Sequence, residues 1–374
     1  MKIRAAVLRQ MGLPAPYAQS KPLLIETIDL APPGPGELLV RVTAAGLCHS
    51  DLSVIDGTRP RVMPMALGHE AAAEVVECGA GVVAYAPGDT VVFSFVPACG
   101  HCAPCASGRA ALCEPGAKAN VAGTLLSGAR RLRDGAGEIN HHLGVSGFAE
   151  YAVVAAASAV KIEPGLPPEI AALFGCAVLT GVGAVVNTAR VTPGASVAVF
   201  GLGGVGLATL LGARAAGAAT IVAIDLLDAK LALARELGAT HTVNAGSDDP
   251  VAAVRELTRG GAEFAFECAG SERVLAQAYA ATGRGGTTVT MGLPHPQKMF
   301  SIPAVSLTVE ERTVKGSYMG SAVPSRDIPR FIAMYRAGLL PVGRLLTQRL
   351  KLDQINEGFD VLARGEAVRQ VVLL

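Results

Sequence analysis

The chain has 374 residues, and its 32 lysine and arginine side chains nearly balance 31 acidic ones. This balance excludes the strong charge bias of a nucleic-acid or acidic-surface binder, and the length predicts two or three domains with substantial cores. The first ten residues contain no apolar core of signal-peptide length, and no apolar run approaches the length of a membrane span. We therefore expect a cytoplasmic protein in a reducing environment, with no nucleic-acid or membrane partner.

The first part of the chain reads as short strands separated by turns. The segments ELLVRVTAAGLC, AAAEVVECGAGV and PGDTVVFSF either alternate apolar with polar residues or lie between glycine and proline breaks. This pattern predicts an antiparallel, barrel-like unit. A segment from about Ala117 to Gly147, charged in its middle, is expected to be a loop-rich insertion.

After Glu169 the pattern changes to strands that alternate with helices. SVAVF, TIVAID, FAFECAG, GGTTVTMG and TVKGS are predicted strands, and GLGGVGLATLLGARAAG and LDAKLALARELGA are predicted helices. Such alternation predicts a parallel, doubly wound sheet. From about Ser321 the chain returns to mixed pieces and ends in a strand, QVVLL. The predicted fold class is therefore α/β, with a doubly wound nucleotide-binding domain beside a mainly β, barrel-like domain.

Four of the eight cysteines lie in one loop, CGHCAPCASGRAALC, from Cys99 to Cys113. Disulfides are one explanation, but they favour small secreted domains without an adequate core, and this chain is neither small nor visibly secreted. The other explanation is a structural zinc ion bound by four thiolates, with no open position for chemistry. The context favours the metal, and Gly100, Pro104 and Gly108 supply the bends of such a loop.

The segment GLGGVG follows the SVAVF strand and begins a predicted helix. Its glycines Gly201, Gly203 and Gly206 have the G-x-G-x-x-G spacing, which permits a tight turn, close approach of a pyrophosphate and close helix–strand packing. The next strand ends in Asp225, whose carboxylate would accept from both ribose hydroxyls and repel a 2′-phosphate. A glycine-rich helix start without a ligand is the alternative. The position between strand and helix favours dinucleotide binding, with NAD preferred over NADP.

Two further segments contain candidate metal ligands. Cys48 opens CHSD, and His69 and Glu70 follow in LGHE, whereas Cys78 and Cys268 lie in strand-like segments and are expected to be small buried hydrophobes. The informative segments are, in chain order, CHSD, LGHE, PGD, the four-cysteine loop, GC at 175–176, GLGGVG, the aspartate after the next strand, and INEGFD. With these segments the chain resembles the zinc-dependent medium-chain alcohol dehydrogenase family, in its two-zinc, dimeric branch, over nearly its full length.

The resemblance implies two zinc ions per chain. Cys48, His69 and Cys176 match the catalytic ligands, and two thiolates with one imidazole leave a fourth position for water or an alcohol. Glu70 matches a residue near the metal that can coordinate it transiently, and Asp51 matches the carboxylate that orients His69. The residues that match the structural zinc ligands are Cys99, Cys102, Cys105 and Cys113.

The resemblance also implies a domain division and a proton route. It implies a GroES-like catalytic domain over residues 1–177 with the structural zinc loop, an NAD-binding Rossmann domain over 178–320, and a return to the catalytic domain over 321–374. Ser50 matches the hydroxyl that binds the zinc-bound alcohol and passes its proton on. Relatives with a full relay carry a histidine where this chain has Ser53, so either His49 or water would have to substitute.

Cofactor and substrate contacts follow from the same resemblance. The cofactor-binding set is Gly201, Gly203, Gly204, Val205, Gly206, Asp225, Lys230, Thr180, His49 and Arg369. In this set His49 and Arg369 match pyrophosphate contacts, Lys230 matches an adenosine-ribose contact, and Val205 and Thr180 match the nicotinamide surroundings.

The implied reaction transfers a hydride between a primary alcohol and NAD, which interconverts alcohol and aldehyde. We expect an aromatic or branched hydrophobic substrate, because Phe95 matches a residue beside the zinc, and Leu143 and Leu293 match the pocket wall further out. Arg59 is either a solvated loop charge or a residue at the pocket mouth that favours a substrate with a distal carboxylate or phosphate.

Other functions compete with this interpretation. S-(hydroxymethyl)glutathione (formaldehyde) dehydrogenases carry an acidic residue in the loop that here contains Arg59, which weakens that alternative. A zinc-free reductase or a non-catalytic NAD- and zinc-binding protein would not need all seven ligand positions, Ser50 and an open zinc position. We expect a homodimer, because segment 117–147 resembles the longer loop of the dimeric branch, and TTVTMG and TVKGSYMG could extend a sheet across a two-fold axis.

Overall fold

The computed structural model describes residues 1–374, and the chain forms two compact units. The first unit comprises Met1–Cys176, Val323–Pro329 and Leu346–Leu374. The second comprises Ala177–Ala322 and Arg330–Leu345. The family resemblance predicts that everything after residue 320 belongs to the first unit, but the stretch Arg330–Leu345 packs within the second. The return to the first unit is therefore made in two pieces.

Five strands from the first 141 residues close a small barrel in the first unit. In barrel order its strands are β1 (Lys2–Leu8), β2 (Leu23–Leu30), β7 (Leu132–Asp134), β8 (Gly137–His141) and β4 (Met65–Ala66). Alternate residues of β1 point to one side because successive side chains of a strand face opposite ways. Ile3, Ala5 and Val7 thus belong to one buried cluster, together with Ile28 of β2.

The expected loop-rich insertion is partly regular structure. It contains most of helix α4 (Glu114–Ala122) and the β7–β8 hairpin, which completes the barrel by pairing with β2 and β4. The hairpin turn is stabilised by Asp134, whose Oδ1 accepts from the N–H groups of Ala136 and Gly137. Strands of three and five residues give too little alternation to be recognised in the sequence, so the prediction of a loop was wrong here.

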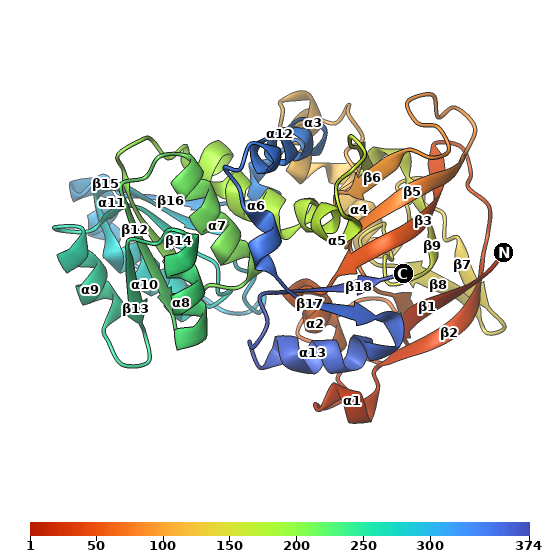
Figure 1. Ribbon diagram of the computed structural model, residues 1–374, viewed down its shortest axis with the longest axis horizontal. Helices are drawn as coiled ribbons and strands as arrows, with labels where there is room; N and C mark the ends of the chain where they lie inside the picture. The colour runs from red at the N-terminus through yellow and green to blue at the C-terminus, as the bar shows by residue number, and fades with distance from the viewer. The chain divides into compact units, whose positions relative to one another are not determined.

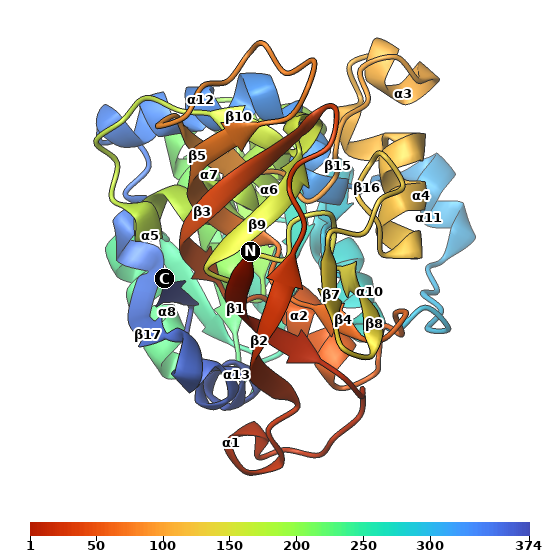
Figure 2. The same cartoon turned by 90° about the vertical axis from the view of Figure 1, so that its right-hand side faces the viewer.

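A larger sheet completes the first unit. Its strands are β10 (Ala159–Lys161), β6 (Thr90–Phe93), β5 (Glu70–Cys78), β3 (Glu37–Gly46), β18 (Arg369–Leu373) and β17 (Leu346–Lys351), with β9 (Tyr151–Ala155) paired to β3. Figure 2 shows the long strand β3 between β5 and β9. The helices of this unit are α1 (Tyr17–Ser20), α2 (His49–Ile55), α3 (Ala103–Ala106), α4, α5 (Pro168–Ala171) and α13 (Ile355–Ala363).

The second unit contains a six-stranded parallel sheet (Figure 1). In spatial order its strands are β13 (His241–Asn244), β12 (Thr220–Asp225), β11 (Ser196–Phe200), β14 (Ala262–Glu267), β15 (Thr282–Thr290) and β16 (Thr313–Gly316). Counted from β11 the order is 3-2-1-4-5-6, which is that of the dinucleotide-binding doubly wound fold. The predicted fold class is therefore confirmed.

Helices cover both faces of this sheet, which explains its continuous apolar strands. All four residues from Val197 to Phe200 are buried, and Ala198 and Phe200 pack in one cluster with Val254 and Ala278. The helices are α6 (Ala177–Gly183), α7 (Gly204–Ala215), α8 (Asp228–Leu237), α9 (Pro250–Leu257), α10 (Glu272–Ala281) and α11 (Ala304–Val309), with α12 (Pro324–Arg336) shared between the units.

No single helix of the structure is long and apolar enough to cross a membrane. Only the consecutive pair Pro168–Gly175 and Ala177–Ala189, bent by 51° at the break between them, meets that test of length and composition. Most of the residues in this pair are buried in the protein, as in the core helices of a globular fold.

Candidate active site

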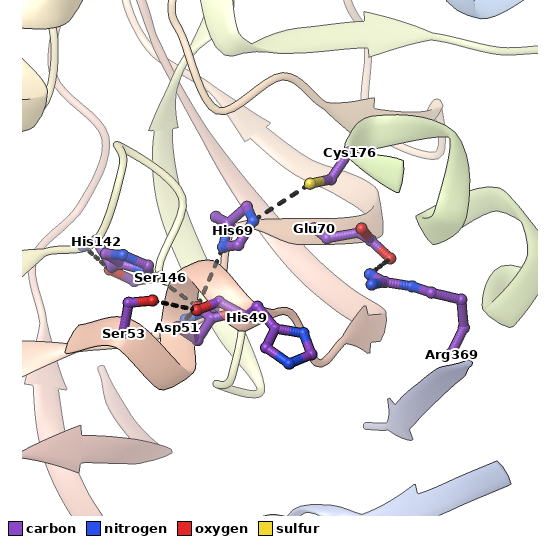
Figure 3. A network of polar contacts seen from close by, with 10 residues as sticks. His49, Asp51, Ser53, His69, Glu70, His142, Ser146, Cys176 and Arg369 are labelled. Carbon is purple, nitrogen blue, oxygen red and sulfur yellow. Dashed lines mark hydrogen bonds and ion pairs between the residues drawn. The ribbon is translucent and has the colours of Figure 1, made fainter. Parts of the chain in front are cut away.

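Three buried side chains of the first unit, Cys48, His69 and Cys176, converge at one point. Figure 3 shows His69 and Cys176 facing one another. Cys48 lies directly before α2, His69 lies directly before β5, and Cys176 lies directly before α6. Their ligand atoms all lie within 4.8 Å of one another, and His69 Nε2 is 3.4 Å from Cys176 Sγ. The three residues predicted as catalytic zinc ligands are thus brought together from distant parts of the chain.

The three ligand groups of this triad influence one another electrostatically. A hydrogen bond with Cys176 lowers the pKa of Cys48 well below its usual value against the opposing effect of burial, and the same bond together with burial raises the pKa of Cys176. Burial acts to lower the pKa of His69, but the charges of Asp51 and Cys48 outweigh it and raise this pKa. Two sulfurs and one imidazole are the donor set of a zinc site with one open position, so the residues fit a zinc ion.

Asp51 fixes the orientation of His69. Its carboxylate is fully buried on α2, and Oδ1 accepts from Gly68 N–H at 3.2 Å and lies 3.1 Å from His69 Nδ1. Burial opposes ionisation, but the positive charge of His69 and hydrogen bonds from two imidazoles keep the pKa of Asp51 below its usual value. Because Nδ1 of His69 faces the carboxylate, Nε2 faces the two cysteines.

A second buried ion pair lies close to the triad. Arg369, the first residue of β18, pairs with Glu70, the first residue of β5 (Figure 3). Both side chains are almost fully buried, at 4% and 0% exposure. Burial raises the pKa of Glu70, and the positive charge of Arg369 partly offsets this effect. Arg369 is predicted as a pyrophosphate contact, and in the structure its guanidinium pairs with the carboxylate of Glu70.

The other residues predicted around the catalytic zinc lie in different environments. Phe95 is buried, and its ring meets that of His69 edge-on with 5.6 Å between centroids. Ser50 is half-buried and His49 is exposed, both at the start of α2. The hydroxyl of Ser53 donates to the backbone carbonyl of His49 at 2.8 Å, a bond within the helix. The hydroxyl hydrogen of Ser53 is therefore used in a hydrogen bond within α2.

The remaining predicted pocket residues differ in exposure. Leu143 is buried, Arg59 is half-buried, and Leu293 in the second unit is 45% exposed. Leu143 has a backbone φ of +50°, an unusual conformation for a branched residue.

The four cysteines of the loop before α4 form a second cluster. The sulfurs of Cys99, Cys102, Cys105 and Cys113 lie within 4.8 Å of one another. All eight cysteines of the chain are free thiols, so the structure contains no disulfide. Backbone N–H groups of Cys99 and Gly116 donate to Cys113 Sγ at 3.3 and 3.4 Å. The N–H of His101 contributes most to lowering the pKa of Cys99 to about 7. This cluster fits a metal ion with four sulfur ligands.

The second unit contains the predicted nucleotide site. Gly201 has φ +89°, and a Cβ on Gly206 would lie 1.8 Å from the carbonyl oxygen of Gly201, so both positions require glycine. A Cβ on Gly203 would meet nothing within 4 Å, which leaves its backbone open to a ligand. Asp225 ends β12 and accepts from the N–H of Leu202 at 2.7 Å. This hydrogen bond connects the glycine turn to the side chain of Asp225.

A cavity of about 430 Å³ lies beside this turn. Its lining residues are Phe200, Gly201, Ile224, Asp225, Leu226, Ala245, Ala269, Ser271, Arg273, Val274 and Gln277. Thr180 lies on α6 and Val205 lies on α7. These two helices pack closely, since a Cβ on Gly181 of α6 would lie 2.5 Å from the carbonyl oxygen of Val205. The cavity has mostly apolar walls with a few polar groups, among them the carboxylate of Asp225 and the guanidinium of Arg273, which is the character of a small-molecule site.

Sequence reasoning missed residues at both sites. His142 lies directly after β8, and its Nδ1 is 3.1 Å from Asp51 Oδ1. The consecutive pair His141–His142, in a chain with only seven histidines, was a signal that could have drawn attention to it. Arg273 and Gln277 line the cavity beside the glycine turn from α10, and no motif in the sequence marks them.

Comparisons with known proteins agree with both units. The family model described as "Alcohol dehydrogenase GroES-like domain" matches residues 34–164. The family model described as "Zinc-binding dehydrogenase" matches residues 204–337. The NDMA-dependent alcohol dehydrogenase of Amycolatopsis methanolica is 39% identical over 377 residues, which cover 100% of this chain and 99% of that protein. The S-(hydroxymethyl)glutathione dehydrogenase of Escherichia coli is 39% identical over 376 residues, which cover 100% of both proteins.

A solved structure shows the same likeness in three dimensions. The crystal structure of benzyl alcohol dehydrogenase from Acinetobacter calcoaceticus matches with a TM-score of 0.93 and 32% identity, covering 100% of this chain and 99% of that one. Fold and sequence together define a zinc-binding dehydrogenase. The chain belongs to the zinc-dependent medium-chain alcohol dehydrogenase family, and its activity is that of an alcohol dehydrogenase-type oxidoreductase.

Proposed function

We propose that the chain is an NAD-dependent alcohol dehydrogenase that interconverts a hydrophobic primary alcohol, aromatic or branched, with its aldehyde. The observation that carries this proposal is the buried triad Cys48, His69 and Cys176 with the Asp51 carboxylate behind the imidazole. A zinc ion on the triad would supply Lewis acidity that lowers the pKa of a bound alcohol, and NAD would accept the hydride.

The residues around the triad have distinct roles in this proposal. Asp51 holds His69 in the tautomer that presents Nε2 to the metal. Ser50 accepts the proton of the alcohol and passes it toward solvent. Ser53 takes no part, because its hydroxyl is engaged by the carbonyl of His49. Phe95, edge-on to His69, provides an apolar contact for the substrate.

The preference for an apolar alcohol is supported by two observations. Phe95 and Leu143 are apolar, buried residues in the same unit as the triad. A benzyl alcohol dehydrogenase shares the fold over the whole chain. A second candidate, oxidation of S-(hydroxymethyl)glutathione, is supported by the full-length relative from Escherichia coli. Arg59 counts against it, because relatives of that type carry an acidic residue in this loop.

We expect two zinc ions per chain, one on each cysteine-containing cluster. His69→Ala should release one equivalent and lower turnover by at least about 10³-fold, because the metal contributes several kcal/mol to the transition state, while the fold is kept. Cys102→Ser should release the other equivalent and lower the thermal midpoint. Elemental analysis of purified protein, with turnover and thermal unfolding, checks both variants.

Cys78 is the matched control for this experiment. Its thiol lies outside both clusters and donates to the carbonyl of Tyr85 at 3.4 Å, a bond that a serine hydroxyl can replace. Cys78→Ser should therefore keep both equivalents of zinc. One equivalent or none in the wild-type protein would contradict the proposed metal content.

We expect the preference for NAD to reside in Asp225. Asp225→Asn keeps the shape of the side chain but removes the charge that binds ribose hydroxyls and repels a 2′-phosphate. The loss of a charged hydrogen bond costs about 1.5–3 kcal/mol, so the KM for NAD should rise roughly 10- to 150-fold. The ratio of kcat/KM for NAD and NADP should narrow at least as much. Asp228→Asn, the same change at an exposed position three residues later, should leave the ratio unchanged. Equal use of NADP by the wild-type protein would refute the role of Asp225.

Steady-state kinetics on a panel of alcohols tests the substrate class. Each methylene added to an apolar alcohol should change kcat/KM by an amount equivalent to roughly 1–3 kcal/mol until the pocket is filled. Benzyl alcohol and its 4-carboxylated analogue should respond equally to Arg59→Ala if Arg59 is a solvated charge. A selective loss of the carboxylated substrate would place Arg59 at the pocket mouth. Efficient oxidation of S-(hydroxymethyl)glutathione with poor oxidation of every apolar alcohol would instead establish the second candidate.

A homodimer is the oligomeric state that we propose. Strand β16 is the last strand of the parallel sheet and pairs with one neighbour, β15, which leaves its outer edge available. In the same unit, Val305, Leu307 and Val309 of α11 are 67%, 40% and 57% exposed. An open edge with nearby exposed apolar side chains is a feature of subunit interfaces.

Light scattering should therefore give twice the chain mass of 38.0 kDa. Val305→Lys places a charge among the exposed apolar residues of α11 and should shift the population toward monomer. Val83→Lys, at a position that is 94% exposed in the first unit, is the control and should leave the mass unchanged. A tetramer mass in dilute solution would contradict the proposal.

A further inference from the structure

A second histidine shares the carboxylate oxygen that orients His69 (Figure 3). His142 is 1% exposed, and its Nδ1 lies 3.1 Å from Asp51 Oδ1, the same distance as Nδ1 of His69. The two imidazole rings meet edge-on, with 5.5 Å between centroids. Nδ1 of His69 makes a hydrogen bond with Asp51 Oδ1, and Nδ1 of His142 lies within ion-pair distance of the same oxygen. Since an ionised carboxylate only accepts hydrogen bonds, it favours a hydrogen on each Nδ1.

The backbone around His142 holds its ring in this position. The N–H of His142 donates to the hydroxyl of Ser146 at 3.1 Å, and the carbonyl of His142 accepts from the N–H of Val145 at 3.1 Å. Leu143 and Ser146 have φ values of +50° and +52°, a conformation that costs energy in residues other than glycine. The loop thus keeps a strained conformation that presents this one side chain to Asp51.

Asp51 Oδ1 therefore lies close to three nitrogen atoms that belong to two segments of the chain. They are the backbone N–H of Gly68, Nδ1 of His69 and Nδ1 of His142. Two donors, both from the segment before β5, would leave the carboxylate free to rotate toward that segment. The third donor comes from the loop after β8 and opposes this rotation. His142 thereby limits the positions that Asp51, and through it the ring of His69, can adopt.

We propose that His142 is a positioning residue for the metal site: it fixes the Asp51 carboxylate and so holds Nε2 of His69 toward the metal. The proposal rests on the proposed function, in which Cys48, His69 and Cys176 hold zinc. It assigns no contact with substrate to His142. Groups that orient the ligand of a metal typically change metal affinity or activity by about 10- to 100-fold when removed.

A pair of nearly isosteric variants separates this role from simple filling of space. His142→Asn keeps an N–H donor near the position of Nδ1, whereas His142→Leu has a similar volume and no donor. The neighbouring residue His141 is the matched control, because it is equally buried and its Nε2 accepts from the backbone N–H of Arg131, away from Asp51. His141→Leu therefore measures the cost of removing a buried imidazole from the same loop.

Two measurements report on the metal directly. The first is the rate at which the triad loses zinc to a chelator, with His69→Ala identifying which equivalent belongs to the triad. The second is the visible absorption of cobalt(II) substituted at the triad, which responds to the angle of the imidazole ligand. His142→Leu should release zinc about 10- to 100-fold faster and shift the cobalt bands. His142→Asn should restore most of both properties, and His141→Leu should resemble the wild type in both.

Each outcome decides between possibilities. Unchanged release and cobalt bands in His142→Leu would overturn the positioning role while leaving the proposed function intact. Equal effects of His142→Leu and His142→Asn would also overturn it, because the donor would then be irrelevant. Absence of metal from the wild-type triad would remove the proposed function and this inference together. If His142→Leu does not fold, His142→Ser, which is too short to reach Asp51, takes its place with the same expectations.

Discussion

The buried carboxylate of Asp51 organises the first unit around the triad. An ionised group without water is costly unless polar contacts compensate for the lost solvation. Here the compensation comes from hydrogen bonds with Gly68 and His69 and from the nearby imidazole of His142. These donors belong to two segments far from α2 in the sequence. The carboxylate can therefore stay ionised while buried only when the segment before β5, the loop after β8 and α2 are all in place. The same contacts orient His69.

The ion pair between Glu70 and Arg369 imposes a second constraint of this kind. It joins β5 to β18 at the end of the chain, and the guanidinium compensates for the burial of a carboxylate next to Cys48. A Cβ on Gly46 would lie 2.3 Å from Glu70 Oε1, so glycine on β3 leaves space for the acid. The C-terminal strand therefore contributes a charge to the surroundings of the triad besides completing the sheet.

Much of the nucleotide unit could be predicted because its signals are local. The turn at Gly201 needs a positive φ, and the contact between Gly201 and Gly206 leaves no room for a Cβ. Such steric demands select glycine at fixed spacing whatever surrounds the turn. Strand β12 is recognisable as a short apolar run that ends in Asp225. By contrast, the contribution of Arg273 to the cavity depends on where α10 packs, and no spacing rule encodes that position.

By itself the sequence determined the α/β class, the glycine turn, the four-cysteine loop and, through family resemblance, the triad residues, since these depend on short spacings or recognisable motifs. Tertiary structure alone decided that His142 shares Asp51 with His69, that Glu70 holds Arg369, and that β7 and β8 close the barrel. The physical reason is the same in each case. A buried polar group needs a partner, and a short strand needs a neighbour. The sequence shows which polar side chains and short strands are present, whereas only the folded structure shows which residue or strand pairs with each of them.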